Sequence, residues 1–549
     1  MAQQNLRYIA FPVLDEAQIA AAAQCTAMAP RQCRDGETLV AVGERAFKFF
    51  IVRSGEVEII DDSGDEPRTI TVHGKGEFTG DISHLTGTPA VFTAIARGDC
   101  KVFEISGEAL RHILNQCQSL SDIILQAFIA RRQLLRESPN FVGLRVIGSR
   151  YSPDTFRVRD FLSRNRVLFT WVDLESDPEV GRLLKEFGIT EADTPVVACA
   201  HMLLLRNPSN LELANQVGVR QSLQRTVYDL LVVGAGPAGL AAAVYGGSEG
   251  LKTAVLDCVA PGGQAGSSMR IENYLGFPTG LTGAELTDRA TLQANKFGAR
   301  ISIPSAATRL TFENRYAVVD AGDDEPITAK CLLIASGAQY RRLDVEDLER
   351  FEGTGVYYAA TPAEALLCRG CPAIVVGGGN SAGQAAVFLA GHASQVLLLI
   401  RGDDLNKNMS SYLVSRIEQT ANIELLCNTT IRRMDGNGHL QAIEFVNGNT
   451  GRTRIIETPA VFSFIGATPR TEWLPLSVER DAKGFVQTGT GVAQSSHWDL
   501  KRAPFLLETS HPGVFAAGDV RSGSVKRVAS AVGEGAMAVQ FVHEYLKGM

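Results

Sequence analysis

The first part of the chain alternates between apolar and polar positions at the spacing of short strands. Residues 49–52, 55–60 and 100–105 carry this pattern, with glycine-bearing turns between them. An apolar run of helical length then follows over residues 120–130. Short alternating strands followed by a helical run predict a small β-barrel closed by helices.

A second pattern occupies residues 141–222, where strand-like and helix-like apolar runs take turns. Strands are predicted at 143–148 and 168–173, and helices at 155–162 and 179–187. Alternation of these lengths predicts a small α/β domain.

From residue 226 onward, an apolar strand, a glycine-rich turn and an alanine-rich helix occur twice in succession. The first turn, Gly234-Ala-Gly236-Pro-Ala-Gly239, follows the strand-like run 228–233. In such a turn the first glycine permits the tight bend, the second lets backbone N–H groups approach a pyrophosphate, and the third allows close helix packing. Asp257 ends the next predicted strand, at the distance expected for a carboxylate that accepts a ribose hydroxyl.

The second turn has the same construction and predicts a second dinucleotide. It reads Gly377-Gly-Gly379-Asn-Ser381-Ala382, after the strand-like run 373–376. Two dinucleotides held side by side allow a hydride to pass between them, which points to an oxidoreductase.

Composition narrows the remaining classes of function. A chain of 549 residues predicts three or four domains, and a net charge of −7 without a long basic run argues against a nucleic-acid partner. The ten cysteines have no regular spacing and no export signal is recognisable at the start, so we expect a cytoplasmic protein. The apolar stretch 230–247 belongs to the first glycine turn, so we expect no membrane segment.

Residues 226–549 resemble the low-molecular-weight thioredoxin reductases. The resemblance rests on both glycine turns and on the motifs Gly262-Gly-Gln264, 271–278, 335–338 and 512–519. It implies an FAD-binding domain at 226–345 and 475–549, an inserted NAD(P)H-binding domain at 346–474, and a homodimer. The further cofactor-binding residues that it implies are Gly263, Gln264, Asn273, Gly337, Gly518, Asp519, Arg527, Val528 and Ala529.

The sequence departs from that family at its redox-active cysteine pair. Where the family has Cys-x-x-Cys after Gly-Val-x-Tyr, this chain has Ala359 and Pro362. Neither side chain can supply the thiolate that disulfide chemistry needs. A second pair, Cys368 and Cys371, follows nearby, and we interpret it as two reduced thiols, with a relocated redox pair as the alternative.

Selection between NADPH and NADH depends on residues after the second strand of the inserted domain. The family holds the 2′-phosphate of NADPH there with His-Arg-Arg, of which this chain keeps only Arg401. Lys407 could assist Arg401, whereas Asp403 and Asp404 would repel the phosphate unless they point to solvent. We predict FAD and NADPH as cofactors, with NADH as the alternative, and no metal.

Residues 1–138 resemble a cyclic-nucleotide-binding domain, through the hairpin at 49–58 and the phosphate cassette at 76–85. In that family a Glu binds the ribose 2′-OH and an Arg pairs with the cyclic phosphate. This chain has Asp81 in place of the Glu and Pro89-Ala90-Val91-Phe92-Thr93 where the Arg is expected. Losing a charged hydrogen bond to a phosphate costs about 1.5–3 kcal/mol, so we predict poor binding of cyclic AMP unless another cation such as Arg97 has taken over.

Residues 141–222 resemble the glutaredoxin and thioredoxin fold. The resemblance implies a cis peptide bond before Pro195. Ser152 and Pro153 open the segment that holds Cys-Pro-x-Cys in that family, so the redox cysteines are absent. Ser152 suits the helix N-cap and Pro153 the first helical position.

Together these patterns predict an α/β multidomain protein. Two Rossmann-like domains follow a cyclic-nucleotide-binding-type β-barrel and a thioredoxin-like α/β domain. The leading hypothesis is a flavoprotein that passes electrons from NAD(P)H through FAD to an acceptor other than an internal disulfide: dioxygen, a quinone or a redox protein. Three alternatives stay open: a thioredoxin reductase that uses Cys368 and Cys371, an enzyme similar to the thioredoxin-reductase-like ferredoxin–NADP reductases, and a non-catalytic redox-sensing scaffold.

Overall fold

The computed structural model describes residues 2–26, 29–62, 67–137, 144–199, 203–322, 325–498 and 500–549. It forms two compact units. The first comprises residues 1–148, 165–224 and 292–304, and the second comprises 149–164, 225–291 and 305–549. The boundary predicted between residues 138 and 141, and the predicted strand start at Gly143, lie outside the described residues.

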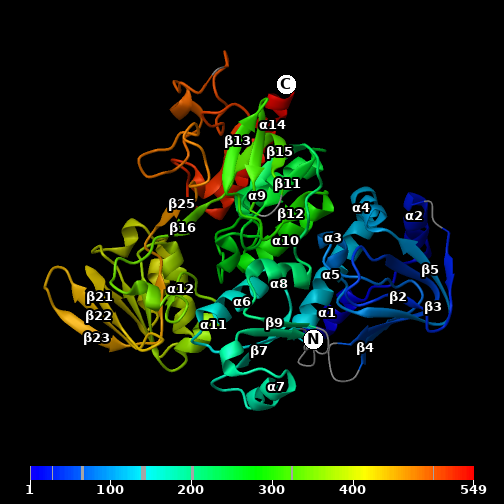
Figure 1. The fold of residues 1–549 in the computed structure, drawn as a ribbon, viewed down its shortest axis with the longest axis horizontal. Helices are drawn as coiled ribbons and strands as arrows, with labels where there is room; N and C mark the ends of the chain where they lie inside the picture. Colours follow the sequence, from blue (N-terminus) through cyan, green and yellow to red (C-terminus); the bar gives the residue numbers. More distant parts are fainter. Residues whose placement is uncertain are drawn as a thin grey trace. The chain divides into compact units, whose positions relative to one another are not determined.

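The first unit begins with the predicted antiparallel barrel-like sheet. Its strands lie in the order β1 (Arg31–Cys33), β5 (Thr93–Ile105), β3 (Phe49–Asp61) and β4 (Arg68–His73), with β2 (Thr38–Val40) beside β5. The helices of this region are α1 (Ala2–Ala10), α2 (Glu16–Thr26), α3 (Ser83–Thr86), α4 (Gly107–Gln116) and α5 (Gln118–Glu137), drawn in blue and cyan in Figure 1.

The prediction of separate strands at 49–52 and 55–60 was wrong, because β3 runs through both. The pairing with β5 shifts register on either side of Ser54, and Gly55 has φ +76°. A Cβ on Gly55 would lie 2.7 Å from the carbonyl oxygen of Asp99, so the glycine lets the two strands stay close instead of ending one of them.

A second, four-stranded sheet of the first unit has the order β7 (Phe169–Asp173), β6 (Leu144–Gly148), β8 (Val196–Cys199) and β9 (Leu203–Arg206). Strands β6 and β7 are parallel, and the other two pairs are antiparallel. Helices α7 (Val180–Glu186) and α8 (Asn210–Val217) complete this segment. The peptide bond between Thr194 and Pro195 is cis, as predicted.

The second unit contains two parallel sheets of similar construction. In the first, β11 (Thr253–Leu256), β10 (Tyr228–Val233), β15 (Ile327–Ile334) and β26 (Val514–Ala516) run parallel. Strands β14 (Tyr316–Asp320) and β13 (Arg309–Glu313) add an antiparallel extension beside β15. Helices α9 (Pro237–Ser248) and α14 (Val528–Leu546) pack against each other and against this sheet (Figure 1).

The other sheet of the second unit has the order β17 (Val356–Tyr357), β24 (Val461–Ser463), β18 (Pro372–Val376), β19 (Gln395–Leu399) and β20 (Ile423–Leu426), all parallel. Helices α12 (Asn380–Ala390) and α13 (Ser411–Gln419) and a small antiparallel sheet of β21 (Thr429–Asp435), β22 (Ala442–Asn447) and β23 (Thr453–Glu457) accompany it. The short strands β16 (Ala338–Tyr340) and β25 (Ala467–Pro469) pair where the chain passes between the two sheets. The predicted α/β class with two dinucleotide-binding folds is confirmed.

Candidate active site

The first glycine turn joins the end of β10 to the start of α9. Gly234 has φ +110°, and a Cβ on it would lie 2.2 Å from the carbonyl oxygen of Ala335. A Cβ on Gly239 would lie 1.8 Å from the carbonyl oxygen of Gly234, so the protein's own packing requires both of these glycines. Gly236, the N-cap of α9, has φ −72°, and a Cβ there would meet no described atom within 4 Å. This open space at a helix N-terminus fits a pyrophosphate.

The second glycine turn repeats this geometry between β18 and α12. Gly377 has φ +140°, and its Cβ would lie 2.4 Å from the carbonyl oxygen of Phe464. Gly379 is the N-cap of α12, and a Cβ on it would again meet no described atom within 4 Å. Ala382, in the place of the third glycine, is fully buried with its Cβ accommodated. The two turns therefore offer two separate spaces for a dinucleotide phosphate.

Asp257 lies at the carboxyl end of β11 and holds the first turn in place. Its Oδ2 accepts a hydrogen bond from the backbone N–H of Ala235 at 2.8 Å, and its Oδ1 accepts from Val259 and Ala260 at 2.9 and 3.1 Å. A carboxylate has about four acceptor positions, so a ribose hydroxyl can still be accommodated. The predicted contact of Asp257 with a ribose stays a prediction.

Three further segments of the predicted flavin site meet the first turn or lie beside it. Gly263 has φ +54°, and its Cβ would lie 3.1 Å from the Cα of Gly236. The Gln264 amide donates to the carbonyl oxygen of Ala338 at 2.5 Å, and Gly337 has φ +66° with open space around it. Asn273 is exposed and makes no hydrogen bond with the described residues, so its flavin contact stays a prediction.

The end of β26 and the start of α14 approach the first turn from the other side. A Cβ on Gly518 would lie 3.0 Å from the Cβ of Ala238, and one on Gly535 would lie 2.1 Å from the carbonyl oxygen of Ala238. Arg527 is the N-cap of α14, and Val528 and Ala529 form its first turn. The fold thus brings Gly518 and the middle of α14 against Ala238, whereas the flavin contacts predicted for residues 519 and 527–529 stay predictions.

Charged groups surround Asp519. Burial, and then the nearby Glu534, raise the pKa of Asp519, whereas Lys526 opposes that shift. Glu534 accepts a hydrogen bond from the N–H of Gly518 at 2.7 Å and pairs with Arg521. These contacts fix the backbone at Gly518 and leave the Asp519 side chain half-buried.

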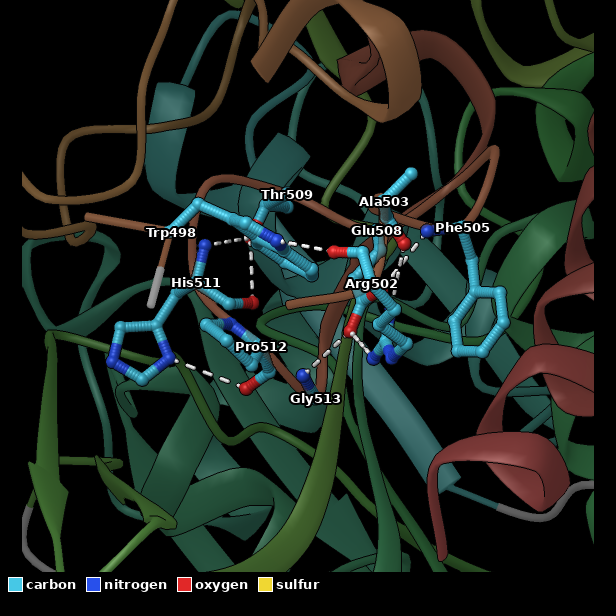
Figure 2. A network of polar contacts seen from close by, with 9 residues as sticks. All are labelled: Trp498, Arg502, Ala503, Phe505, Glu508, Thr509, His511, Pro512 and Gly513. Carbon is cyan, nitrogen blue, oxygen red and sulfur yellow. Dashed lines mark hydrogen bonds and ion pairs between the residues drawn. The ribbon is translucent and has the colours of Figure 1, made fainter. Parts of the chain in front are cut away.

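A buried ion pair supports the strand that leads to Asp519 (Figure 2). The Arg502 guanidinium donates to both oxygens of Glu508, at 2.6 and 2.8 Å, and Glu508 is 0% exposed. Glu508 also accepts from the N–H groups of Phe505 and Gly513, at 3.0 Å each. Because Gly513 directly precedes β26, this bidentate pair fixes the entry of that strand.

A cleft lies between the two glycine-turn regions of the second unit. Its lining includes Gln264, Tyr340, Ala359, Ser381 and Phe464. The full lining, completed by residues 267–269, 358, 360, 384 and 385, contains no cysteine among the described residues. Ala359, which we predicted to stand in place of the first redox cysteine, therefore borders this cleft.

Cys368 and Cys371 lie away from this cleft. Cys368 ends the 3₁₀ turn η4 (Leu366–Cys368), is 0% exposed and belongs to an apolar cluster with Ala365 and Leu389. Burial raises the pKa of the Cys368 thiol to about 12. Both thiols are free, and neither lines the cleft.

Arg401 follows β19 and is exposed. Lys407, predicted as a second cation for the 2′-phosphate, instead pairs with Asp403 at 2.6 Å. Asp404 accepts a hydrogen bond from the N–H of Asn406 at 2.8 Å as the cap of a short helical turn. Lys407 thus offsets the charge of Asp403, one of the two aspartates that we expected to repel the 2′-phosphate. Arg401 stays the candidate for binding that phosphate.

Helix α6 (Pro153–Arg164) belongs to the second unit, next to the segment that precedes Ala359. As predicted, Ser152 caps it, accepting from the N–H of Thr155 at 3.2 Å. The rings of Phe156 and Tyr357 lie 5.5 Å apart, and Arg164 donates to the carbonyl oxygen of Gly263 at 3.2 Å. Sequence reasoning missed these contacts because no local motif marks them.

In the first unit, the candidate nucleotide cassette lines a cavity. Gly80, Asp81, Ala90 and Val91 are among its lining residues. Arg97, the cation that could have replaced the missing Arg, pairs with Glu58 and is not among them. The described residues contain no cluster of potential metal ligands and no helix of the length and hydropathy that a membrane span requires.

Comparison with known proteins agrees with this geometry. The family model "Pyridine nucleotide-disulphide oxidoreductase" matches residues 228–535, and the model "Cyclic nucleotide-binding domain" matches residues 30–117. Thioredoxin reductase of Bacillus subtilis is 31% identical over 325 residues, which cover 59% of this chain and 96% of that protein. The "34.2 kDa protein in rubredoxin operon" of Clostridium pasteurianum is 30% identical over 58% of this chain and 97% of its own length.

Solved structures give the same result. Lactococcus lactis thioredoxin reductase in its FR conformation matches with a TM-score of 0.53 and 27% identity, over 59% of this chain and all of that chain. The thioredoxin reductase of T. acidophilum matches with a TM-score of 0.52 and 28% identity, over 58% of this chain and 98% of that chain. The chain therefore belongs to the pyridine nucleotide-disulphide oxidoreductase family, as an NAD(P)H-dependent flavoprotein oxidoreductase of the thioredoxin reductase-like type with FAD and NADPH as its cofactors, preceded by a cyclic-nucleotide-binding domain.

Proposed function

We propose that this protein passes electrons from NADPH through FAD to a small acceptor and not to an internal disulfide. A quinone is the acceptor that we consider first. The observation that carries the proposal is the cleft beside the flavin motif, which is bordered by Ala359 and has no cysteine in its described lining. Disulfide reduction needs a sulfur close to the reactive flavin atoms, within about 3–3.5 Å. The only sulfur in the described lining is the thioether of Met269, which cannot form a disulfide.

The chain's residues fit both cofactors. Gly236 and Gly379 leave room for two pyrophosphates at two helix N-termini. We assign Asp257, which accepts a hydrogen bond from Ala235 of the first turn, to the ribose of FAD, and the exposed Arg401 to the 2′-phosphate of NADPH. The FAD that these residues would hold would supply two-electron redox chemistry between NADPH and an acceptor.

The aromatic side chains of the cleft lead us to propose a quinone as that acceptor. Tyr340 and Phe464 lie edge to face with their ring centroids 5.6 Å apart, and Tyr358 also lines the cleft. The cleft has a volume of about 30 Å³, so it must open to admit a quinone ring. A tyrosine phenol is protonated at neutral pH, and burial raises the pKa of Tyr340 further, so this phenol can donate a hydrogen bond to a quinone oxygen. Reducing the quinone to its quinol consumes two electrons and two protons. The hydride of NADPH supplies both electrons and one proton, and water supplies the second proton.

Cys368 and Cys371 are a weaker candidate for the acceptor. The Cys368 thiol is completely buried, and its raised pKa keeps it protonated at neutral pH, whereas attack on a disulfide requires a thiolate. A thioredoxin reductase that used this pair would have to expose Cys368 from the apolar cluster that holds it.

The test compares acceptors in the wild type and in two sets of variants. We expect NADPH oxidation with a water-soluble quinone or ferricyanide, and no reduction of thioredoxin. The Cys368→Ser and Cys371→Ser double variant should keep the quinone activity. Thioredoxin reduction by the wild type that disappears in this double variant would refute the proposal.

A gain-of-function variant tests the position of the missing cysteines directly. Ala359→Cys with Pro362→Cys restores the Cys-x-x-Cys spacing next to the cleft, so the reduced protein should gain one NADPH-reducible disulfide, counted by thiol titration. Ala360→Cys is the matched control, because it adds a single thiol to the same cleft and cannot close a disulfide with position 359 or 362. Adding NADPH to the oxidised proteins should release two thiols in the double variant and none in the control, and no release in the double variant would show that this segment does not face the flavin.

A further inference from the structure

The N-terminal cavity, defined by its lining residues in the first unit, has a volume of about 750 Å³ and lies outside the electron-transfer site. Ligand sites of drug-sized molecules have volumes of roughly 300–1,000 Å³. Its walls come from α1, β3, β4, the cassette around Gly80, residues 90–94 and α5. The cavity is therefore large enough for an organic ligand.

One end of the cavity is basic. Arg131 of α5 is 7% exposed, and its guanidinium donates to the carbonyl oxygens of Ala10, Gly80 and Phe78 at 2.8, 2.5 and 2.9 Å. These three partners are neutral. Burial lowers the pKa of Arg131, and the carboxylates of Asp81 and Glu77 lie near enough to oppose that shift without a direct ion pair among the described residues. A guanidinium has five N–H groups, and these three hydrogen bonds leave two of them for a ligand.

The charged residues of the lining are also mostly basic. Arg7, Lys48, Arg68 and Arg131 contribute positive charge, and Asp81 is the acidic residue among the lining residues described. Asp81 already accepts a hydrogen bond from the N–H of Ser83 at 2.9 Å. In a chain with a net charge of −7, this concentration of positive charge favours an anionic ligand.

Part of the cavity wall is apolar. Val40, Phe47, Ala90 and Ala94 line it and belong to one buried cluster, against which Ile59 packs. Val91 and Phe92 also line the cavity, in the stretch where a cyclic-nucleotide site would have its phosphate-binding Arg. A phosphate placed there would lose its water without gaining a cation, whereas an alkyl or aryl group would be stabilised by burial.

We propose that the N-terminal cavity binds an amphipathic carboxylate, of the medium-chain fatty acid type, in place of a cyclic nucleotide. The carboxylate meets the two remaining N–H groups of Arg131, since a guanidinium edge matches the two oxygens of a carboxylate. The hydrocarbon chain extends toward Ala90 and Ala94. The ligand's single charge and apolar body match the single buried cation and the apolar wall.

The proposal predicts how affinity changes with the ligand. Calorimetry on the full-length holoprotein should show binding of octanoate, decanoate and dodecanoate, with Kd falling about fourfold for each added CH₂. Decanol, which has the chain without the charge, should bind at least tenfold more weakly than decanoate. Cyclic AMP should not displace decanoate.

Two substitutions locate the site. Ala90→Trp fills the apolar part and should abolish decanoate binding, whereas Val72→Trp, on an exposed position of β4 outside the lining, should leave it unchanged. Arg131→Gln removes the buried charge and should weaken decanoate at least tenfold while changing decanol little. If this variant does not fold, the comparison of decanoate with decanol and the Ala90→Trp variant decide the question.

Several results would overturn the proposal: no binding of any of the three carboxylates, affinity independent of chain length, decanol equal to decanoate, or binding retained in Ala90→Trp. Displacement of decanoate by cyclic AMP at micromolar concentration would identify the cavity as a nucleotide site instead.

Discussion

The second glycine of each turn allows the two cofactor sites to be separated by single substitutions. Gly236→Val should abolish FAD binding, whereas Gly379→Val should leave the flavin in place and abolish its reduction by NADPH. Both glycines have negative φ, −72° and −101°, and a Cβ on either meets no described atom within 4 Å. The protein itself therefore tolerates a side chain at both positions, and only a bound pyrophosphate conflicts with it.

The expected free-energy changes are small for folding and large for cofactor binding, so each substitution should affect its cofactor selectively. Replacing a glycine whose conformation suits other residues changes the free energy of unfolding by less than about 1 kcal/mol. Displacing a pyrophosphate from two charge-assisted backbone hydrogen bonds costs about 3–6 kcal/mol, which weakens binding by about 10²- to 10⁴-fold. Gly239→Val is the contrasting control, because its Cβ would lie 1.8 Å from the carbonyl oxygen of Gly234 and should destabilise the fold itself.

The assay is an absorption spectrum of each purified variant, followed by anaerobic titration with NADPH. We expect about one FAD per chain in the wild type and in Gly379→Val, and a colourless, folded protein for Gly236→Val. Circular dichroism confirms folding. A yellow Gly236→Val protein that NADPH reduces at the wild-type rate would refute the assignment of the first turn to FAD.

Three further predictions concern the thiols, the nucleotide preference and the buried ion pair. Iodoacetamide should label Cys371 before Cys368 at pH 8, because the Cys368 thiol is buried and its pKa is raised to about 12. Labelling of Cys368 should accelerate as the pH rises toward that value. Peptide mass spectrometry measures both labelling rates, and equal rates would contradict the burial of Cys368. Arg401→Ala should lower kcat/KM for NADPH by about 10- to 100-fold and leave NADH nearly unchanged, whereas equal losses with both cofactors would contradict a 2′-phosphate role. Glu508→Gln should lower the free energy of unfolding by up to about 3 kcal/mol, since Arg502 loses its buried partner, and an unchanged denaturation midpoint would contradict this.

Local signals in the sequence were sufficient for the features that depend on neighbouring residues. The glycine turns and the Ser152 cap follow from residue types within a few positions of one another, whereas the cis bond before Pro195 was implied by the resemblance to the thioredoxin fold. The predicted strands were close to the observed ones except at β3, where a bulge at Gly55 resembled a turn, and at β5, which begins at Thr93 and not at residue 100.

Features that depend on distant residues could not be predicted. Arg131 bonds with Ala10 and Gly80 across 121 and 51 residues, and no periodicity in α5 marks it. Lys407 and Asp403 are close in sequence. Whether the pair favours or disfavours NADPH nevertheless depends on the direction of the two side chains, which residue types do not determine. The same limit applies to the cleft, whose lining residues span positions 264 to 464.

The placement of β26 beside β15 has a consequence for biosynthesis. The sheet under the first glycine turn is built from residues 228–334 and then completed by residues 514–516, with α14 packing on α9. During translation the segment that contains β17 to β24 leaves the ribosome before that sheet has its last strand. The chain must therefore hold an incomplete sheet while the inserted region folds, and the flavin contacts predicted for residues 518–529 can form only after these residues have emerged.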